Sequence, residues 1–189
     1  MKKKRGLLLF LIIFFQLAIL SFMVLNSYTV ILWGEKIVLQ VIPVDPHSLF
    51  QGEYVMLGYE INQLDLTKIE HDLDPDKITH QERIYLALEP QNDTWIPVMV
   101  TKTKDKVKDK LYLQGRVLYM SPSPIDEKKE WTPDYQPTLT QLHAEWGIEQ
   151  YFVPEGQGKQ IEEQVQKGII YAEVSVYRGK ARVTGLINK

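Results

Sequence analysis

Three carboxylates in one short segment come closest to a pattern that could do chemistry. Asp45, Glu53 and Glu60 stand within PVDPHSLFQGEYVMLGYEI, Pro43 to Ile61. Carboxylate oxygens bind hard cations such as Ca²⁺, so these three define a candidate cation site. The structural alternative is that Asp45 caps a bend and Glu53 accepts backbone N–H groups or an arginine. Arg116 is the preferred partner, because an arginine in mid-strand usually needs a carboxylate. We favour this structural alternative and expect no metal.

The histidines and serines are not spaced as an active site requires. His47, His71, His80 and His143 show no i,i+2 or i,i+4 pair and no HExxH, so we expect no zinc site. The chain has no cysteine, which excludes thiol chemistry and disulfides. A membrane peptidase-like enzyme is the least favoured class, since no serine stands between Ile42 and Val44, where the signal peptidase box would need it. We expect no catalysis and no cofactor.

An apolar run near the N-terminus predicts a membrane anchor. Lys2 to Arg5 are basic, and the segment from Leu7 to Leu25 is interrupted only by Gln16 and Ser21. Nineteen helical residues rise roughly 28 Å, the thickness of a bilayer's hydrocarbon core. Basic residues before the span favour a cytoplasmic N-terminus and an extracytoplasmic C-terminal domain in the cell membrane. A cleaved signal peptide would have a shorter apolar run followed by a small-residue cleavage site.

The division of charge separates two regions. Residues 1–33 form a basic tail and anchor, and residues 34–189 form the predicted exterior domain. The chain carries a net charge of −2 although its first region holds four basic residues and no acidic one, so the exterior domain is acidic overall. Nucleic acid requires a basic surface, and we therefore exclude it as a partner.

The exterior domain is predicted to be mainly β, an antiparallel sandwich or barrel with one short helix. Short runs of β-branched and aromatic residues alternate with Pro, Gly, Asn and Asp, and the linkers are too short for helical crossovers. The predicted strands are Lys36–Val44, Glu53–Ile61, Arg83–Glu89, Trp95–Thr103, Leu111–Met120, Trp146–Val153, Ile169–Tyr177 and Lys180–Ile187. In the second of these, Val55, Leu57, Tyr59 and Ile61 alternate and should face the core.

The last two strands allow a prediction of register. A two-residue turn at Arg178-Gly179 pairs residues 177 with 180, 176 with 181, 174 with 183, 172 with 185 and 170 with 187. One face then holds only apolar or small residues, whereas the other holds polar ones.

Four connecting segments complete the expected organisation. Ile161 and Val165 share a helical face, so residues 159–167 are predicted to form the short helix with Gly168 as its C-cap. Residues 65–76 are a candidate helical turn, 102–110 a charged, solvated hairpin tip, and 121–137 a proline-rich extended loop.

The segment Gly52-Glu53-Tyr54-Val55-Met56-Leu57-Gly58-Tyr59 resembles the signature of the GDYXXLXY family of bacterial membrane-anchored proteins. The resemblance continues in LEP (88–90), in GRV (115–117) and in WGIEQYFVPEG (146–156), and it covers almost the whole exterior domain. Glu53 replaces the aspartate of the motif, which preserves a charge but puts a tight aspartate cap in doubt.

The resemblance implies a single-span protein with a β-rich exterior domain and no assigned activity. We expect a binding or assembly partner of other, multi-pass membrane proteins, with Tyr54 and the loops 43–52 and 154–158 as the contact surface. The alternative is a small-ligand or cell-envelope binding module with an aromatic cleft, for which Trp131, Tyr135 and Trp146 are candidates. The candidate functional residues are Asp45, Gly52, Glu53, Tyr54, Leu57, Tyr59, Arg116, Glu149, Tyr151, Pro154, Glu155 and Gly156.

Overall fold

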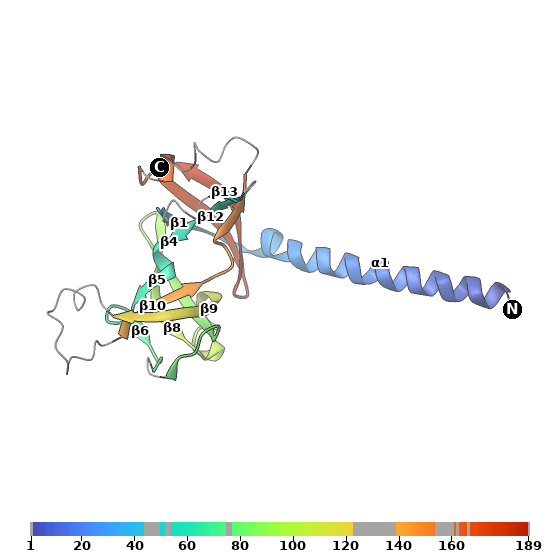
Figure 1. Cartoon of the computed structure of the whole chain (residues 1–189), viewed down its shortest axis with the longest axis horizontal. Coiled ribbons are helices and arrows are strands. Elements are labelled where there is room, and N and C mark those ends of the chain that lie inside the picture. The colour runs from blue at the N-terminus through green and yellow to red at the C-terminus, as the bar shows by residue number, and fades with distance from the viewer. Residues whose placement is uncertain are drawn as a thin grey trace.

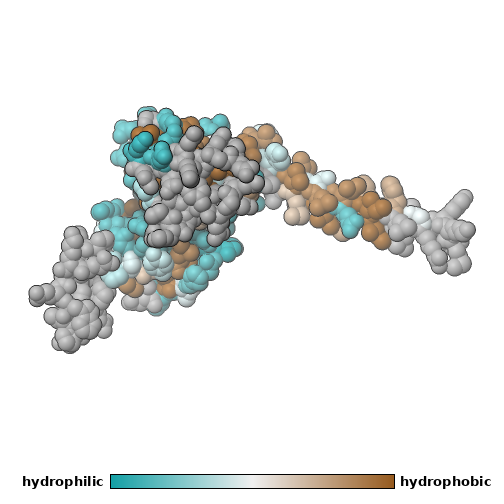
Figure 2. Space-filling model, turned by 45° about the horizontal axis from the view of Figure 1, so that its top comes forward, coloured by the Kyte–Doolittle hydropathy of each residue, from teal (hydrophilic) through white to brown (hydrophobic). Residues whose placement is uncertain are grey.

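The computed structural model describes residues 2–43, 50–51, 54–74, 77–122, 139–153, 161, 163–165 and 167–188. A long helix leads into a body built from strands (Figure 1). The prediction of a mainly β domain that follows one N-terminal apolar helix is confirmed. In the space-filling view, the helix is covered mostly by apolar residues, whereas polar residues cover much of the visible body (Figure 2).

The helix α1 spans Lys2–Trp33 and continues about two turns beyond the C-terminal end of the predicted span at Leu25. Its segment Phe10–Trp33 is long and apolar enough to cross a membrane. The last turns stay helical because they pack on the β body: Val30 is buried, and the Ser175 hydroxyl donates to the Val30 carbonyl at 2.6 Å. The helix is therefore joined to the body by side-chain contacts as well as by the chain.

Three sheets form the body. The strands are β1 (Glu35–Ile42), β2 (Phe50–Gln51), β3 (Tyr54–Met56), β4 (Gly58–Tyr59), β5 (Gln63–Asp65), β6 (Glu70–His71), β7 (Arg83–Gln91), β8 (Thr94–Thr101), β9 (Leu111–Pro122), β10 (Leu139–Glu145), β11 (Gln150–Phe152), β12 (Ile170–Tyr177) and β13 (Lys180–Asn188). Their orders are β13-β12-β1-β4, β5-β10-β9-β7-β8-β6 and β11-β3-β2. As predicted, most pairs are antiparallel, and β6–β8 is a parallel exception.

The predicted strand Glu53–Ile61 is interrupted. It divides into β3 and β4 at Leu57, and a 3-10 turn, η2 (Glu60–Asn62), follows. The alternation nevertheless holds, because Val55, Leu57, Tyr59 and Ile61 are all buried in the main core. Only the last part of the predicted strand Trp146–Val153 is extended, as β11, since residues 146–149 turn around Gly147 at a φ of 76°.

The strand β10 was not predicted. Its sequence LTQLHAE contains three polar residues and a histidine, so it lacks a clear apolar alternation, yet it pairs with both β5 and β9. Within residues 65–74 the predicted helical turn is wrong, because a turn and the short strand β6 occupy that segment.

The predicted hairpin register is right near the turn and wrong beyond it. Arg178 and Gly179 adopt positive φ, and residues 177, 176 and 174 pair with 180, 181 and 183 as predicted. A bulge then places Glu173 opposite Gly185, so Ala172 pairs with Leu186, and Ile170 with Asn188. Thr184 lies at this bulge, where its hydroxyl donates to the Glu173 carboxylate at 2.8 Å. Leu186, and not Ile187, therefore packs against the core.

The segment 102–110 is not a hairpin tip. Both β8 and β9 flank β7, so this segment crosses from one side of β7 to the other through the 3-10 turn η4 (Lys104–Lys106). Val107 is fully buried against a second small core with Tyr85, Ala87 and Tyr112. The lysines that suggested a solvated tip surround this one apolar residue.

The short predicted helix is present where the structure describes its residues, at 161 and 163–165. Gly168 ends it at a φ of 69°, with its N–H donating to the Val165 carbonyl and the Ile169 N–H to the Gln164 carbonyl. These two bonds form the C-terminal motif predicted from the glycine.

Candidate functional site

Two segments that lie far apart in the sequence meet at one place in the body. The strand β11 pairs with β3, with Tyr151 opposite Val55 and Phe152 opposite Tyr54. Where β3 ends, the Leu57 N–H donates to the Glu149 carbonyl at 2.7 Å. The resemblance quoted residues from both segments, and their pairing gives those residues a shared structural role.

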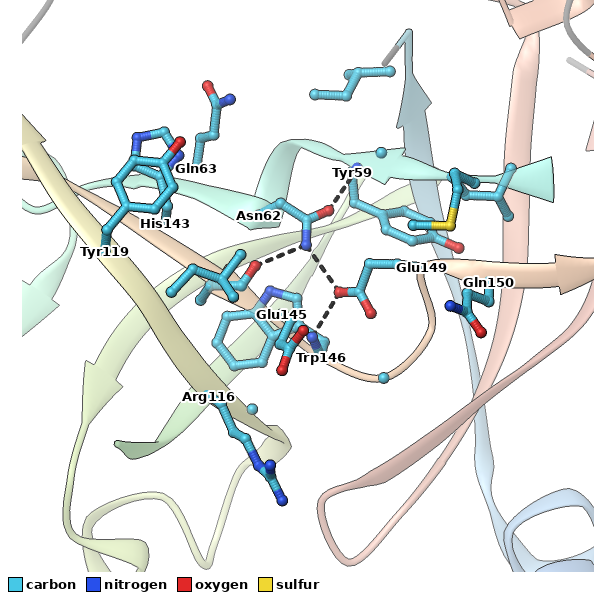
Figure 3. A pocket seen from close by; sticks show the side chains of 18 of the residues that line it. Tyr59, Asn62, Gln63, Arg116, Tyr119, His143, Glu145, Trp146, Glu149 and Gln150 are labelled. Atoms are coloured by element: carbon cyan, nitrogen blue, oxygen red, sulfur yellow. Dashed lines mark hydrogen bonds between the residues drawn. The ribbon is translucent and has the colours of Figure 1, made fainter. Parts of the chain in front are cut away.

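The Glu149 carboxylate is the centre of a hydrogen-bond network. Its Oε1 accepts from the Trp146 N–H at 2.6 Å and from the Asn62 side chain at 2.9 Å, and its Oε2 accepts from the Ile148 N–H at 3.0 Å. Two donors from its own turn and one from η2 thus stabilise the carboxylate. Figure 3 shows Asn62 and Glu149 pointing toward each other between Tyr59 and Trp146.

Asn62 and Tyr59 connect this turn to β4. The Asn62 amide also donates to the Ala144 carbonyl at 2.9 Å, and its oxygen accepts from the Tyr59 N–H at 2.8 Å. The Tyr59 hydroxyl, which is buried, donates to the Ile148 carbonyl at 2.9 Å. Burial, and secondarily the nearby charge of Glu149, raises the pKa of Tyr59, so the phenol stays protonated and keeps donating.

Trp146 closes the network on its apolar side. Its ring is buried, and its Nε1–H donates to the Ile61 carbonyl at 2.9 Å. The ring lies against Gly115 of β9, where a Cβ would overlap both the ring and the Glu145 carbonyl. We call Tyr59, Asn62, Trp146 and Glu149 the clasp. Its polar groups bond one another or nearby backbone, and this arrangement is typical of a structural element.

A model of the GDYXXLXY protein family matches residues 16–186. The chain belongs to the GDYXXLXY family. Comparison with curated proteins and with solved structures finds no match. In this GDYXXLXY protein, the leucine and the last tyrosine of the motif are Leu57 and Tyr59, which are both buried and bonded to the turn of the clasp. The burial and bonding of these two residues indicate that both have a structural role.

A cleft of about 690 Å³ lies beside the clasp in this GDYXXLXY protein. Residues of β4, β9 and β10 line it together with the clasp, and its exposed or half-buried polar side chains include Gln63, Gln114, Arg116, Glu145 and Gln150. Polar side chains thus converge on a partly apolar hollow, a feature common to small-ligand sites.

Tyr119 and His143 form an aromatic pair at one side of the cleft. Their rings stack at 4.1 Å between centroids, and the tyrosine is 56% exposed (Figure 3). The Ser121 hydroxyl lies 3.0 Å from Nε2 of His143, and burial lowers the pKa of that histidine. A serine beside a neutral histidine is half of a nucleophilic arrangement. In the part of the chain that the structure describes, no carboxylate bonds to His143 to orient it.

The prediction that Arg116 pairs with Glu53 assumed that the arginine is buried, and this assumption is wrong. Arg116 is exposed on β9, points away from the clasp and donates to the Gln81 side chain at 3.1 Å (Figure 3). It is not a buried arginine in need of a carboxylate. Its predicted partner Glu53 lies outside the described residues.

Several other candidate residues also fall outside the described part of the chain. They are Asp45, Gly52, Pro154, Glu155 and Gly156, together with Trp131 and Tyr135 of the alternative cleft. The backbone of Tyr54 is described in β3, and Tyr151 is half-buried against the core. Among the described residues, no three histidine or acidic side chains cluster as metal ligands.

The sequence analysis missed Asn62, Tyr119, His143 and Glu145 as site residues. His143 was considered only as a zinc ligand. Asn62 had a weak signal, since it is a polar residue directly after an apolar alternating row. The other three lie on β9 and β10, whose pairing could not be foreseen once β10 was overlooked.

Proposed function

We propose that this protein is an exterior β domain, anchored by a single membrane-spanning helix, that assembles with another membrane protein. The N-terminal basic residues favour a cytoplasmic tail, with the β body on the other side of the membrane. The family match and the apolar helix support the anchored domain.

The observation that carries the assembly proposal is Gln16. It stands at the midpoint of the apolar run Leu7–Leu25, too deep for its side chain to reach either interface. Its side chain is exposed on the helix surface and has no hydrogen-bond partner among the described residues. An amide left without a partner in hydrocarbon costs several kcal/mol by transfer scales, about 4–8. A polar group on a neighbouring membrane helix removes that cost.

The surface around β3 and β11 supports a second contact outside the membrane. Phe152 lies opposite Tyr54 across this pair of strands and is 62% exposed. Aromatic side chains are enriched in protein interfaces, and an anchored domain meets its neighbours at raised effective concentration. This strand pair contains Tyr54, around which the sequence analysis predicted the contact surface.

We expect Gln16→Leu to reduce recovery of the partner. Purification of the intact protein in a mild detergent, with bound proteins quantified by mass spectrometry, measures this directly. One interhelical hydrogen bond in a membrane is worth about 1–2 kcal/mol in model helices, so recovery should fall about fivefold or more.

Ser21→Ala is the matched control, because a helical serine can bond to the carbonyl one turn earlier and needs no partner helix. Equal recovery with wild-type and Gln16→Leu proteins would contradict the proposal. If a second, differently tagged copy of this chain were the protein that co-purified, the contact would be self-association and not assembly with another protein. Tyr54→Ala tests the exterior surface in the same way.

The cleft favours a second candidate function, the binding of a hydroxyl-rich cell-envelope fragment. Glu145 is half-buried in the cleft and bonds to no described residue, so its carboxylate can accept from a ligand. The neighbouring glutamine amides can both donate and accept, and Tyr119 offers an aromatic face. These groups suit a sugar ring.

Titration with an N-acetylglucosamine tetramer, followed by calorimetry, tests this second function. We expect Tyr119→Ala to weaken binding about threefold to tenfold, the worth of one aromatic contact. Tyr177→Ala, which changes a tyrosine that does not line the cleft, is the control. An absence of binding at millimolar sugar, or an equal loss in both variants, would count against a sugar site.

A further inference from the structure

A second hollow lies where the anchor meets the body. It has a volume of about 450 Å³ and is lined by Met23 and Val30 of α1, by residues 179–182 of the β12–β13 hairpin and by Gln114, Trp146 and Gly147. In Figure 1 the strands β12 and β13 lie on the side of the body from which α1 leaves. The hollow therefore lies between the helix and the hairpin, on the side of the body from which α1 leaves.

Among the described residues that line this hollow, two carry a positive charge and none carries a negative charge. They are Lys180 and Arg182, which are both exposed. Ala181, which lies between the two cations, and Val183, which follows them, pack against the core. Because side chains alternate along a strand, both cations lie on the outward face of β13. The register of the hairpin thus directs two positive side chains away from the core of an otherwise acidic domain.

The contact between the helix and the body fixes the height of these two cations relative to the membrane. Ser175 holds the Val30 carbonyl, and a Cβ on Gly34 would overlap both the Ser175 hydroxyl and that carbonyl, so helix and body meet closely. Met23 lies two residues before the end of the apolar run Leu7–Leu25. With Arg5 at the inner interface, the apolar run places the outer edge of the hydrocarbon core near Leu25. The phosphate groups of the outer leaflet lie just beyond that edge, at the level of the hollow.

We propose that Lys180 and Arg182 bind the headgroups of anionic lipids in the outer leaflet, at the base of the anchor. The lipid phosphate occupies the hollow between the hairpin and α1, and the acyl chains lie along the helix below Met23. This contact holds the exterior domain upright on the membrane. It rests on the membrane span of the proposed function, and it is independent of any protein partner.

The test uses the full-length protein in vesicles of phosphatidylcholine that contain spin-labelled phosphatidylglycerol or spin-labelled phosphatidylcholine. Electron paramagnetic resonance gives the preference of the protein for the anionic lipid. Each basic residue near an anionic surface strengthens attraction several-fold, so Lys180→Gln with Arg182→Gln should lower this preference about tenfold. Lys2 to Arg5 contribute a constant background at the inner leaflet.

The matched control is Lys68→Gln with Lys77→Gln, which removes the same charge from exposed lysines near β5 and β6, away from α1 in Figure 1. An unchanged lipid preference in the hairpin variant, or an equal fall in the control, would overturn the proposal. Displacement of the labelled lipid by millimolar inorganic phosphate at constant ionic strength would also overturn it, since the hollow would then be a site for a soluble anion. Flotation of each variant with the vesicles shows that the span itself is intact, so failure of the anchor is distinguished from failure of the lipid site.

Discussion

Replacement of Glu149 by alanine is expected to destabilise the exterior domain by about 3 kcal/mol or more. The change leaves the Trp146 N–H, the Ile148 N–H and one Asn62 proton without their acceptor. Each donor left unsatisfied when buried costs about 1–3 kcal/mol, and half-burial of Glu149 reduces the sum. Urea unfolding of the full-length protein in detergent micelles, followed by tryptophan fluorescence, measures the loss.

Glu145→Ala provides a matched comparison. This carboxylate lies four residues earlier, is also half-buried and bonds to no described residue, so its loss should change the free energy of unfolding by less than about 0.5 kcal/mol. Glu149→Gln should fall between the two, because the amide keeps one acceptor but places a donor against an N–H group. Equal stabilities of the Glu145 and Glu149 alanine variants would show that the clasp does not stabilise the fold.

The second large effect is expected at Gly115, where alanine should cost about 2–3 kcal/mol by overpacking. The added Cβ would overlap the Trp146 ring and the Glu145 carbonyl. Neither can move easily, since the ring is held by its bond to the Ile61 carbonyl and the carbonyl belongs to β10. The same unfolding experiment gives this value.

Gly185→Ala is the control for this prediction. Gly185 also lies in a strand, but a Cβ there would meet nothing within 4 Å. Alanine at such an open position should be neutral or slightly stabilising, because it reduces the freedom of the unfolded chain. A similar loss of stability at Gly115 and Gly185 would mean that the cost comes from strand propensity and not from contact with Trp146.

The clasp also explains what the family motif does in this chain. Leu57 and Tyr59 join the first motif to the turn at residues 146–149, and Gly115 leaves room for the tryptophan that closes it. Three stretches that the resemblance quoted separately are thus parts of one contact. The surfaces that we propose for partners or ligands, around β3 and β11 and in the cleft beside Tyr119, lie next to this contact.

The sequence by itself determined the long apolar helix, the β class and the buried row from Val55 to Ile61. These follow from local patterns, namely an unbroken apolar run and strict alternation, which need no knowledge of the neighbouring elements. The Arg178-Gly179 turn and the cap at Gly168 were predictable for the same reason, because positive φ is a property of single residues and their immediate chain.

The tertiary structure alone decided the contacts between distant segments. The Asn62 amide reaches the Glu149 carboxylate only because β3 pairs with β11 and brings the two segments together. The bulge at Thr184 likewise coincides with a bond from its hydroxyl to Glu173 across the hairpin. Ser175 lies on the face of the last hairpin that was predicted to be polar, yet it is buried because the last turns of α1 cover it. A pattern within one strand gives the direction of a side chain, but it does not reveal which element will cover it.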